Sequence, residues 1–274
     1  MISFPGAKIN LGLWVTEKRA DGYHSLESVF YPIRWTDAVE LVPSDQTSLE
    51  ISGLEVPGSI ESNLMYRAWQ KMDDLFKIGP VAMYLHKVVP MGAGLGGGSA
   101  NAAAIINLID SQFALGLIAE ERRSIASGLG SDCAFFIESI PCFASGKGEL
   151  LNPIALNLNA YSLVVIHPGI ISNTAEAYQN IKPQPAKYNL ASLPDLSPEY
   201  WKGVVGNDFE EGIFRKYPEV KELKENLYKN GALYAAMSGS GSAVFGLFKK
   251  TPAIELLQLP SHYSWFIQKE EGSD

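Results

Sequence analysis

The sequence has very few cysteines: Cys133 and Cys142 are the only two among 274 residues. They form no C-x-x-C motif, and two cysteines are too few for a disulfide framework. Free cysteines are among the most buried residue types, and disulfides are rare in the reducing cytosol. We therefore predict two buried, reduced thiols with a packing role.

The sequence also lacks an excess of positive charge and a long hydrophobic run. Its 22 Lys and Arg residues against 30 Asp and Glu residues give a net charge of −8, whereas nucleic-acid and membrane-surface proteins normally carry a basic excess. Polar residues such as Asn107 and Asp110 interrupt the longest apolar stretch, 102–119, which excludes a transmembrane helix there. Residues 1–8 lack the basic and apolar regions of a signal peptide. We expect a cytoplasmic protein with small-molecule partners, with no nucleic-acid or membrane partner, and either monomeric or homodimeric.

The remaining composition is typical of a globular enzyme. A hydrophobic fraction of 46% and a charged fraction of 19% exclude intrinsic disorder. The length exceeds the usual size of one domain, so two domains are expected. Strand and helix patterns are mixed without regular β-α-β alternation, which favours an α+β fold over a doubly wound α/β fold. The predicted strands cover residues 7–13, 24–32, 81–89, 163–166, 233–237 and 244–248. The predicted helices cover 63–76, 120–127, 218–230 and an alanine-rich segment to about 115, for which Ser99 is the expected N-cap because its hydroxyl can accept from an amide of the first turn.

The strongest motif is a glycine-rich segment between a predicted strand and a predicted helix. Residues 90–99 have the sequence PMGAGLGGGS. Glycines let the backbone approach a ligand closely, and the N–H groups and dipole of the following helix favour an anion. A flexible linker is the alternative, but a linker would not stand between a strand and an alanine-rich helix. We therefore predict that this segment binds a phosphate group.

Other nucleotide and catalytic motifs are absent or incomplete. Residues 92–97 match the dinucleotide fingerprint G-x-G-x-x-G, which leaves a nicotinamide-dependent oxidoreductase as an alternative, but the strand with a terminal acid that should follow is not predicted. The Walker sequence, the H-R-D and D-F-G sequences of protein kinases, and the hydrolase sequence G-x-S-x-G do not occur. The four histidines have no paired spacing, so no protein metal site is predicted.

Three further sets of residues have both a structural and a functional interpretation. Lys8 and Asn10 lie on one face of the first predicted strand, where an isolated pair would simply face solvent. Asp132 follows a Gly-Ser pair, and its structural interpretation is that it simply caps the next short element. The sequence SGSGS at 238–242 is either a tight turn or a second set of backbone amides that closes over a phosphate.

Together these segments resemble the GHMP kinase superfamily of small-molecule kinases. The resemblance rests on PGAKINL at 5–11, PMGAGLGGGSANA at 90–102 and MSGSG at 237–241. It implies an α+β, two-domain GHMP kinase fold, with an N-terminal ribosomal-protein-like domain and a C-terminal ferredoxin-like domain with a cleft between them. On this basis we expect the ATP-binding N-terminal domain over residues 1–150 and the C-terminal domain over residues 151–274.

Three shorter sequences resemble one branch of that superfamily. They are RADGYH at 19–24, GSD at 130–132 and HPG at 167–169. The resemblance implies transfer of the γ-phosphate of ATP, with Mg²⁺, to the tertiary 2-hydroxyl of a cytidine diphosphate methylerythritol in the non-mevalonate isoprenoid precursor pathway. The alternatives are another GHMP kinase, of the mevalonate or homoserine type, and a catalytically inactive relative that only binds a nucleotide or sugar.

The same resemblance implies a role for each candidate residue. Asp132 would be the base that takes the hydroxyl proton, and Lys8 would orient the hydroxyl and stabilise developing charge. Substrate binding is implied for Asn10, Tyr23, His24 and, by a weaker alignment, Tyr178. ATP binding is implied for Asn63, Lys87, Pro90, Met91, Gly92, Ala93, Gly94, Leu95, Gly96, Gly97, Gly98, Ser99 and Ala100.

Overall fold

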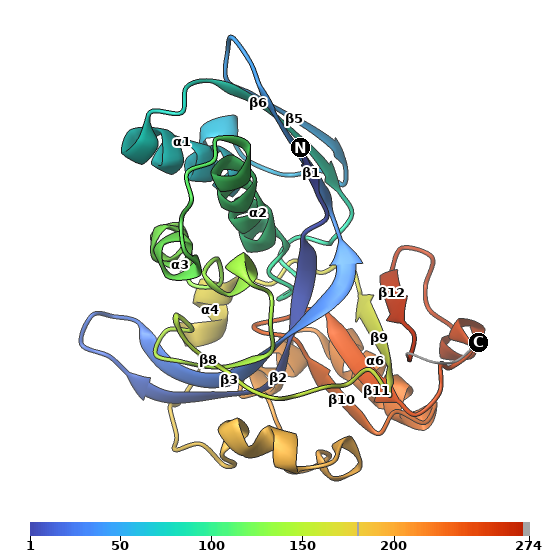
Figure 1. The fold of residues 1–274 in the computed structure, drawn as a ribbon. Coiled ribbons are helices and arrows are strands. Elements are labelled where there is room, and N and C mark those ends of the chain that lie inside the picture. The colour runs from blue at the N-terminus through green and yellow to red at the C-terminus, as the bar shows by residue number, and fades with distance from the viewer. Residues whose placement is uncertain (180, 271–274) are drawn as a thin grey trace. The chain divides into compact units, whose positions relative to one another are not determined.

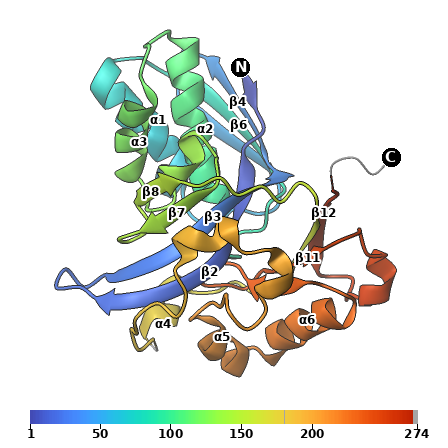
Figure 2. The same cartoon turned by 60° about the horizontal axis from the view of Figure 1, so that its bottom comes forward.

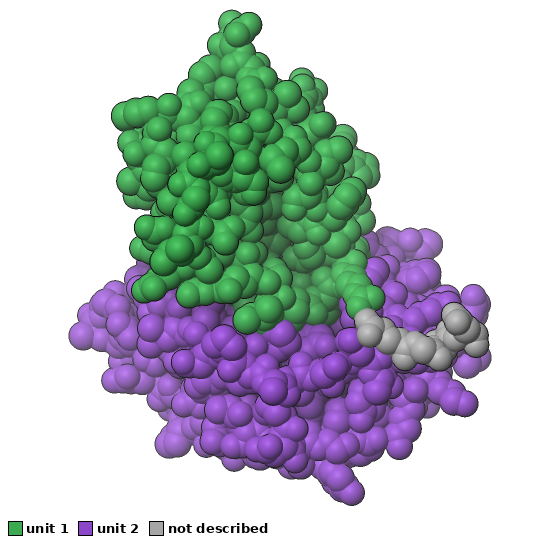
Figure 3. Space-filling model, in the orientation of Figure 1, with its two compact units in different colours: residues 1–8, 32–91, 96–140 green, residues 9–31, 92–95, 141–274 purple. Residues whose placement is uncertain are grey.

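The computed structural model describes residues 1–179 and 181–270 (Figure 1). The chain forms two compact units, each assembled from several separate segments (Figure 3). Unit 1 contains residues 1–8, 32–91 and 96–140, and unit 2 contains residues 9–31, 92–95 and 141–274. The glycine-rich segment is thus divided between the units. The predicted domain extents of 1–150 and 151–274 stay predictions.

Unit 1 contains a four-stranded sheet with the order β1-β4-β6-β5. Strand β5 pairs with β6 in parallel, and the other pairs are antiparallel. Helices α1 and α2 cover one face of this sheet (Figures 1 and 2). The elements of unit 1 are β1 (Ile2–Ser3), β4 (Ala38–Pro43), β5 (Ser48–Gly53), α1 (Leu64–Phe76), β6 (Val81–Lys87), α2 (Gly97–Gln112), α3 (Ala119–Ser127) and the short 3₁₀ helices Ile60–Ser62 and Phe135–Ile137.

The two main helices of unit 1 differ in how much of their surface they bury. Helix α1 is amphipathic and buries Met65, Ala68 and Met72 along one stripe, as expected of a helix at a surface. Helix α2 is buried on most of its circumference, including the alanines from Ala100 to Ala104. Small side chains let this helix pack closely on all sides, so its first turn is fixed by the surrounding structure.

Unit 2 contains two four-stranded sheets with the orders β2-β3-β7-β8 and β10-β11-β9-β12. The second sheet is antiparallel throughout. Helix α6 packs on it, because Val220, Leu223 and Leu227 share one core cluster with Val164 and Val244 (Figure 2). The elements are β2 (Gly6–Lys18) and β3 (His24–Thr36), which each extend into unit 1 at one end, and β7 (Cys142–Ser145), β8 (Leu150–Pro153), β9 (Ser162–His167), α4 (Thr174–Gln179), α5 (Glu210–Lys216), α6 (Pro218–Lys229), β10 (Tyr234–Met237), β11 (Val244–Phe248), β12 (Ser264–Gln268) and 3₁₀ helices at 190–195, 198–200 and 254–257.

Every strand and helix expected from the sequence is present, with shifted ends. The prediction that Ser99 caps the glycine-loop helix is wrong, because α2 begins at Gly97 and its N-cap is Gly96, with a φ of +72°. A left-handed φ is readily adopted by glycine. Strands β1, β4, β5, β7, β8 and β12 and helices α4 and α5 were not predicted.

Both thiols are free and buried, as the sequence predicted. Burial raises the pKa of Cys133 to about 11 and that of Cys142 to about 12, from an ordinary value of 9.0. In the part of the chain that the structure describes, no helix is long and apolar enough to span a bilayer.

We expect both thiols to react slowly with an aromatic disulfide reagent at pH 8. Raising the pKa of Cys133 from 9.0 to about 11 lowers its thiolate fraction at this pH by about a hundredfold, and burial hinders access further. The rate should increase as the pH is raised towards 11, and both thiols should react rapidly in denaturant. Fast modification of the native protein at pH 8, or a reductant requirement for its activity, would contradict the packing role.

Candidate active site

A lysine and an aspartate form an ion pair in unit 1. Lys8 on β2 places its Nζ 3.5 Å from Oδ2 of Asp132. The Lys8 side chain is 4% exposed and that of Asp132 is 29% exposed. Burial lowers the pKa of Lys8, and the charge and hydrogen bond of Asp132 oppose this effect. The Asp132 carboxylate is therefore accessible to a ligand, whereas the Lys8 side chain is buried.

The turn that presents Asp132 is fixed by its neighbours. The backbone N–H of Cys133 donates to the Gly130 carbonyl at 3.1 Å, and the Cys133 side chain is completely buried. The hydroxyl of Ser131 approaches Asp132 Oδ1 at 3.5 Å. Because the next residue is anchored in the core, the carboxylate has a defined position and still faces outward.

The start of α2 lies directly beside this pair. A Cβ built at Gly96 would lie 3.4 Å from Lys8 Cγ and 2.7 Å from Phe136 Cζ. The first intrahelical bond runs from the Ala100 N–H to the Gly96 carbonyl at 2.9 Å. The N–H groups that precede it in the first turn have no acceptor within a helix and point along its axis, where they favour an anion. Unit 1 therefore brings together Lys8, Asp132 and the N-terminal half-turn of α2.

In unit 2 the remaining glycine-loop residues pack against the second small-residue segment. Ser238 Oγ donates to the Gly94 carbonyl at 2.9 Å, and the Ala243 N–H donates to the Ala93 carbonyl at 3.1 Å. A Cβ at Gly94, whose φ is +76°, would lie only 2.0 Å from the Ser238 carbonyl oxygen. The segment 238–242 is thus more than an isolated turn, since it supports the glycine loop.

Asn207 supports this segment in turn, and sequence reasoning missed it. Its Nδ2 donates to the carbonyls of Met237 at 2.9 Å and Gly239 at 2.8 Å. Asn207 is buried. A single asparagine between a loop and a short helix carries no sequence signal, so only the fold reveals this role.

Asn10, a predicted substrate ligand, also contacts this segment. Its Nδ2 donates to Ser28 Oγ at 2.9 Å, and its Oδ1 accepts from Ser238 Oγ at 3.4 Å. The side chain is 2% exposed. Asn10 therefore connects β2, β3 and the 238–242 segment, and its contact with substrate stays a prediction.

The predicted cytidine-binding residues form an aromatic group in unit 2. The rings of His24 and Tyr178 are stacked, with centroids 5.0 Å apart and planes 20° apart. Phe209 packs edge-on against Tyr178 at 4.8 Å. Tyr23 is 61% exposed, and the Lys147 Nζ lies 4.8 Å from its ring centre. The weakly aligned Tyr178 thus does lie beside His24, and Phe209 is a neighbour that the sequence did not suggest.

The two residues predicted near the adenosine have clear structural partners in unit 1. Asn63 caps α1, with its Oδ1 accepting from the Met65 N–H at 2.9 Å. The Lys87 ammonium is bound to the Asp37 carboxylate, and both side chains are almost completely buried. Their roles towards ATP stay predictions.

The described residues contain no group of three or more His, Cys, Asp or Glu side chains that could hold a metal ion. Mg²⁺ is usually bound through one or two carboxylates, water and substrate phosphates. The partly exposed carboxylate of Asp132 beside the start of α2 fits this mode of binding.

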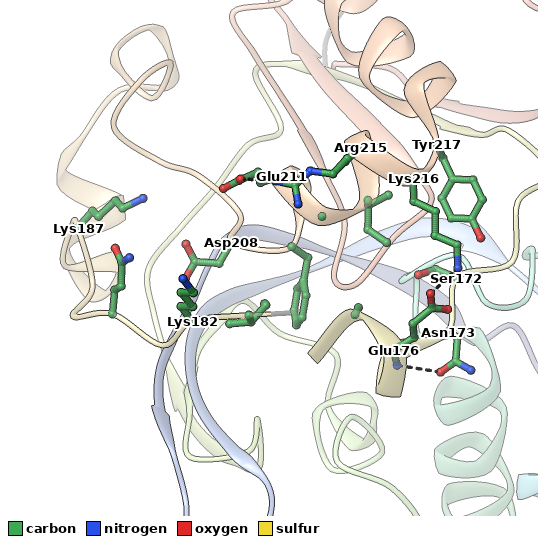
Figure 4. A pocket seen from close by; sticks show the side chains of 16 residues that line it. Ser172, Asn173, Glu176, Lys182, Lys187, Asp208, Glu211, Arg215, Lys216 and Tyr217 are labelled. Atoms are coloured by element: carbon green, nitrogen blue, oxygen red, sulfur yellow. Dashed lines mark hydrogen bonds and ion pairs between the residues drawn. The ribbon is translucent and has the colours of Figure 1, made fainter. Parts of the chain in front are cut away.

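A pocket of about 450 Å³ lies in unit 2 (Figure 4). Its lining includes Phe209 but none of the predicted site residues. Two ion pairs lie in its lining: Lys216 donates to Glu176 at 2.6 Å, and Arg215 donates to Glu211 at 2.8 Å. The lining also includes Lys182, Lys187 and Asp208.

Comparison with known families places the chain in one of them. The model described as the GHMP kinases N terminal domain matches residues 63–139, and the model described as GHMP kinases C terminal matches residues 189–263. The chain belongs to the GHMP kinase family, and the predicted α+β, two-domain fold is confirmed.

The relatives and solved structures point to one kind of kinase within this family. The chain is 47% identical to the 4-diphosphocytidyl-2-C-methyl-D-erythritol kinase of Bacteroides fragilis, over 90% of this chain and 92% of that one. It is 46% identical to the enzyme of the same name from Cytophaga hutchinsonii, over 92% and 94%. A crystal structure of 4-(cytidine 5'-diphospho)-2C-methyl-D-erythritol kinase superposes with a TM-score of 0.78 at 29% identity, over 97% and 98% of the chains. The Methanococcus jannaschii mevalonate kinase, at 14% identity and a TM-score of 0.70 over 99% and 98%, shares the fold alone.

We expect Gly94→Ala to weaken ATP binding strongly, because its methyl group would collide with the Ser238 carbonyl and displace the loop. Gly116→Ala is the matched control, since Gly116 has a similar φ of +71° and no atom within 4 Å of a built Cβ. The control should lower the free energy of unfolding by about 1–2 kcal/mol, because alanine is strained at a left-handed φ, and should leave ATP binding unchanged. Calorimetric titration with a non-hydrolysable ATP analogue, below the unfolding temperature of both variants, measures the difference. Equal ATP affinity in the two variants would show that the loop does not bind the phosphates.

Proposed function

We propose that this kinase transfers the γ-phosphate of ATP to the 2-hydroxyl of 4-diphosphocytidyl-2-C-methyl-D-erythritol. The observation that carries the proposal is the Lys8–Asp132 pair, 3.5 Å apart beside the start of α2. The names of the relatives supply the substrate. A cytoplasmic location and a monomeric or homodimeric state stay predictions.

The reaction needs a base for the hydroxyl and positive charge for the phosphates. The Asp132 carboxylate accepts the hydroxyl proton as the oxygen bonds to the γ-phosphorus. At the same time the bond from this phosphorus to the β–γ bridging oxygen breaks, and ADP leaves. Phosphoryl transfer demands mainly positioning and charge stabilisation from the protein. The α2 amides and the Lys8 ammonium supply that charge, and Lys8 also orients the hydroxyl.

Two features of the pair suit this role. The carboxylate is partly exposed, so it can reach a bound hydroxyl, whereas the lysine is almost fully buried. Burial lowers the pKa of Lys8, and the neighbouring Asp132 carboxylate opposes this effect and so favours the ammonium form. Mg²⁺, when bound with ATP, would neutralise charge on the β- and γ-phosphate oxygens.

The aromatic group in unit 2 would recognise the cytosine. Every base presents a π-face to an aromatic ring, and stacking contributes about 1–3 kcal/mol per base. With their centroids 5.0 Å apart, the His24 and Tyr178 rings leave no room for a base between them. The base therefore stacks on the outer face of one ring, or the two rings separate to about 7 Å to admit it.

We expect Asp132→Asn to lower kcat by about 10²–10⁴-fold while ATP still binds, because the hydroxyl loses its general base. Lys8→Ala should also lower kcat, and the double variant should lose less than the product of the single losses because both groups act on one hydroxyl. Asp45→Asn, at an exposed position of unit 1, is the control and should have the parental rate. Steady-state assays of phosphotransfer to the cytidine substrate measure these rates. Near-parental turnover by Asp132→Asn would show that Asp132 only caps the next element and is not the base.

We expect Tyr178→Ala to raise the Kd of the cytidine substrate by about 5–150-fold, the equivalent of one lost stacking contact. ATP affinity should hardly change, because the proposed ATP ligands are other residues. Tyr178→Phe should retain most of the affinity, and Tyr200→Ala, at a tyrosine that is 68% exposed, should have no effect. Binding titrations measure all three variants.

His24→Ala should reduce discrimination between cytidine and uridine substrates, since a hydrogen-bonding site rejects a base that leaves it unpaired. If neither Tyr178→Ala nor His24→Ala changes KM or base preference, the cytidine assignment is wrong, even where Asp132 and Lys8 are catalytic.

A further inference from the structure

The buried ion pair between Asp37 and Lys87 stands at the base of the glycine loop. Asp37 is the single residue between β3 and β4, and Lys87 is the last residue of β6. Strands β4 and β6 pair with Ala38 opposite His86, so the antiparallel register places Asp37 opposite Lys87. Val88 and Val89 follow Lys87 and lead into the glycine-rich segment, which begins at Pro90. Asp37, Lys87, Val88 and Val89 all belong to unit 1.

Asp37 fixes the two peptide groups that lead into the glycine-rich segment. Its Oδ1 accepts the N–H of Val88 at 2.7 Å and the N–H of Val89 at 2.8 Å. Its Oδ2 accepts a hydrogen bond from the Lys87 ammonium. The carboxylate has no exposed surface, so every contact it makes is with the protein. Three donors on one carboxylate hold the end of β6 and the start of the loop as one rigid piece.

The Lys87 ammonium lies against the first residue of α2. A Cβ built at Gly97 would be 2.9 Å from Lys87 Nζ and 3.1 Å from Val89 Cγ1. A helix N-terminus carries partial positive charge, so a buried cation beside it is unfavourable unless an anion compensates. Asp37 supplies one negative charge, and it opposes the lowering of the Lys87 pKa that burial causes. The Lys87 ammonium is therefore held beside the start of α2 at a cost in desolvation. Such a cation suits a helix start that binds an anion of higher charge than one carboxylate.

We propose that Asp37 and Lys87 are positioning residues for the triphosphate of ATP. Asp37 fixes the peptides of Val88 and Val89, and Lys87 adds positive charge beneath the first turn of α2. In this account Lys87 acts on the phosphates through the loop and does not contact the adenine base. The inference rests on the proposed function, in that the loop must bind ATP.

The test removes both charges and keeps the hydrogen bond. In Asp37→Asn/Lys87→Gln the introduced asparagine carbonyl can still accept from Val88 and Val89, and the asparagine amide can donate to the carbonyl of the introduced glutamine. Replacing both members of a buried ion pair is far less destabilising than removing one. The control is Asp110→Asn/Arg122→Met, which removes a partly buried ion pair of 3.6 Å at the opposite end of α2.

Calorimetry should give Kd values for a non-hydrolysable ATP analogue and for inorganic tripolyphosphate. We expect both ligands to bind about tenfold more weakly to the neutral pair, by equal factors, while the KM of the cytidine substrate and the affinities of the control stay parental. If the neutral pair does not fold, Asp37→Asn/Lys87→Met, which also replaces both members and keeps a carbonyl for the two backbone donors, should show the same losses.

Unchanged Kd values for both ligands would overturn the proposal and leave the pair a structural role only. A loss for the ATP analogue without a loss for tripolyphosphate would also overturn it, because it would place Lys87 at the nucleoside. Failure of the proposed function would be seen separately, as a parental protein that binds neither ligand or transfers no phosphate.

Discussion

A Cβ would come within 3.0 Å of a neighbouring atom at four positions of the glycine-rich segment, Gly92, Gly94, Gly96 and Gly97, and much of the candidate site depends on this constraint. A Cβ would lie 2.0 Å from a backbone oxygen at Gly94, 2.7 Å from the Phe136 ring at Gly96 and 2.9 Å from the Lys87 ammonium at Gly97. The backbone of the loop is therefore in direct contact with its surroundings on several sides. Its N–H groups are held in place by this packing, and in the proposed function that reduces the entropy lost when they bind phosphate.

The same close packing links the loop to the chemical groups. In unit 1, the start of α2 is packed between the stem of Lys8 and the end of Lys87. Each lysine has one carboxylate partner, Asp132 for Lys8 and Asp37 for Lys87. The two pairs differ in exposure: Asp132 is 29% exposed and Asp37 is fully buried. One carboxylate can therefore take part in chemistry, whereas the other can only position its neighbours.

Sequence reasoning located the groups that have strong local signals. The loop, the first strand and the amphipathic helices α1 and α6 follow from glycine spacing, alternation and helical periodicity. It placed the helix cap at Ser99, because hydroxyl side chains favour that position, whereas tertiary packing puts Gly96 there. It could not find Asp37, Asn207 or Phe209, since each acts through a partner distant in the chain. Strands β5 and β8, with mostly exposed residues, show too little alternation to predict.

The most direct test of the central claim is a phosphotransfer assay with ATP, Mg²⁺ and a panel of alcohols. The panel contains 4-diphosphocytidyl-2-C-methyl-D-erythritol, methylerythritol phosphate without the cytidine, mevalonate and homoserine. We expect stoichiometric ADP release and phosphorus resonances of a new 2-phosphate ester with the first compound, and little turnover with the other three. Preferred phosphorylation of mevalonate or homoserine, or equal rates with and without the cytidine, would contradict the account.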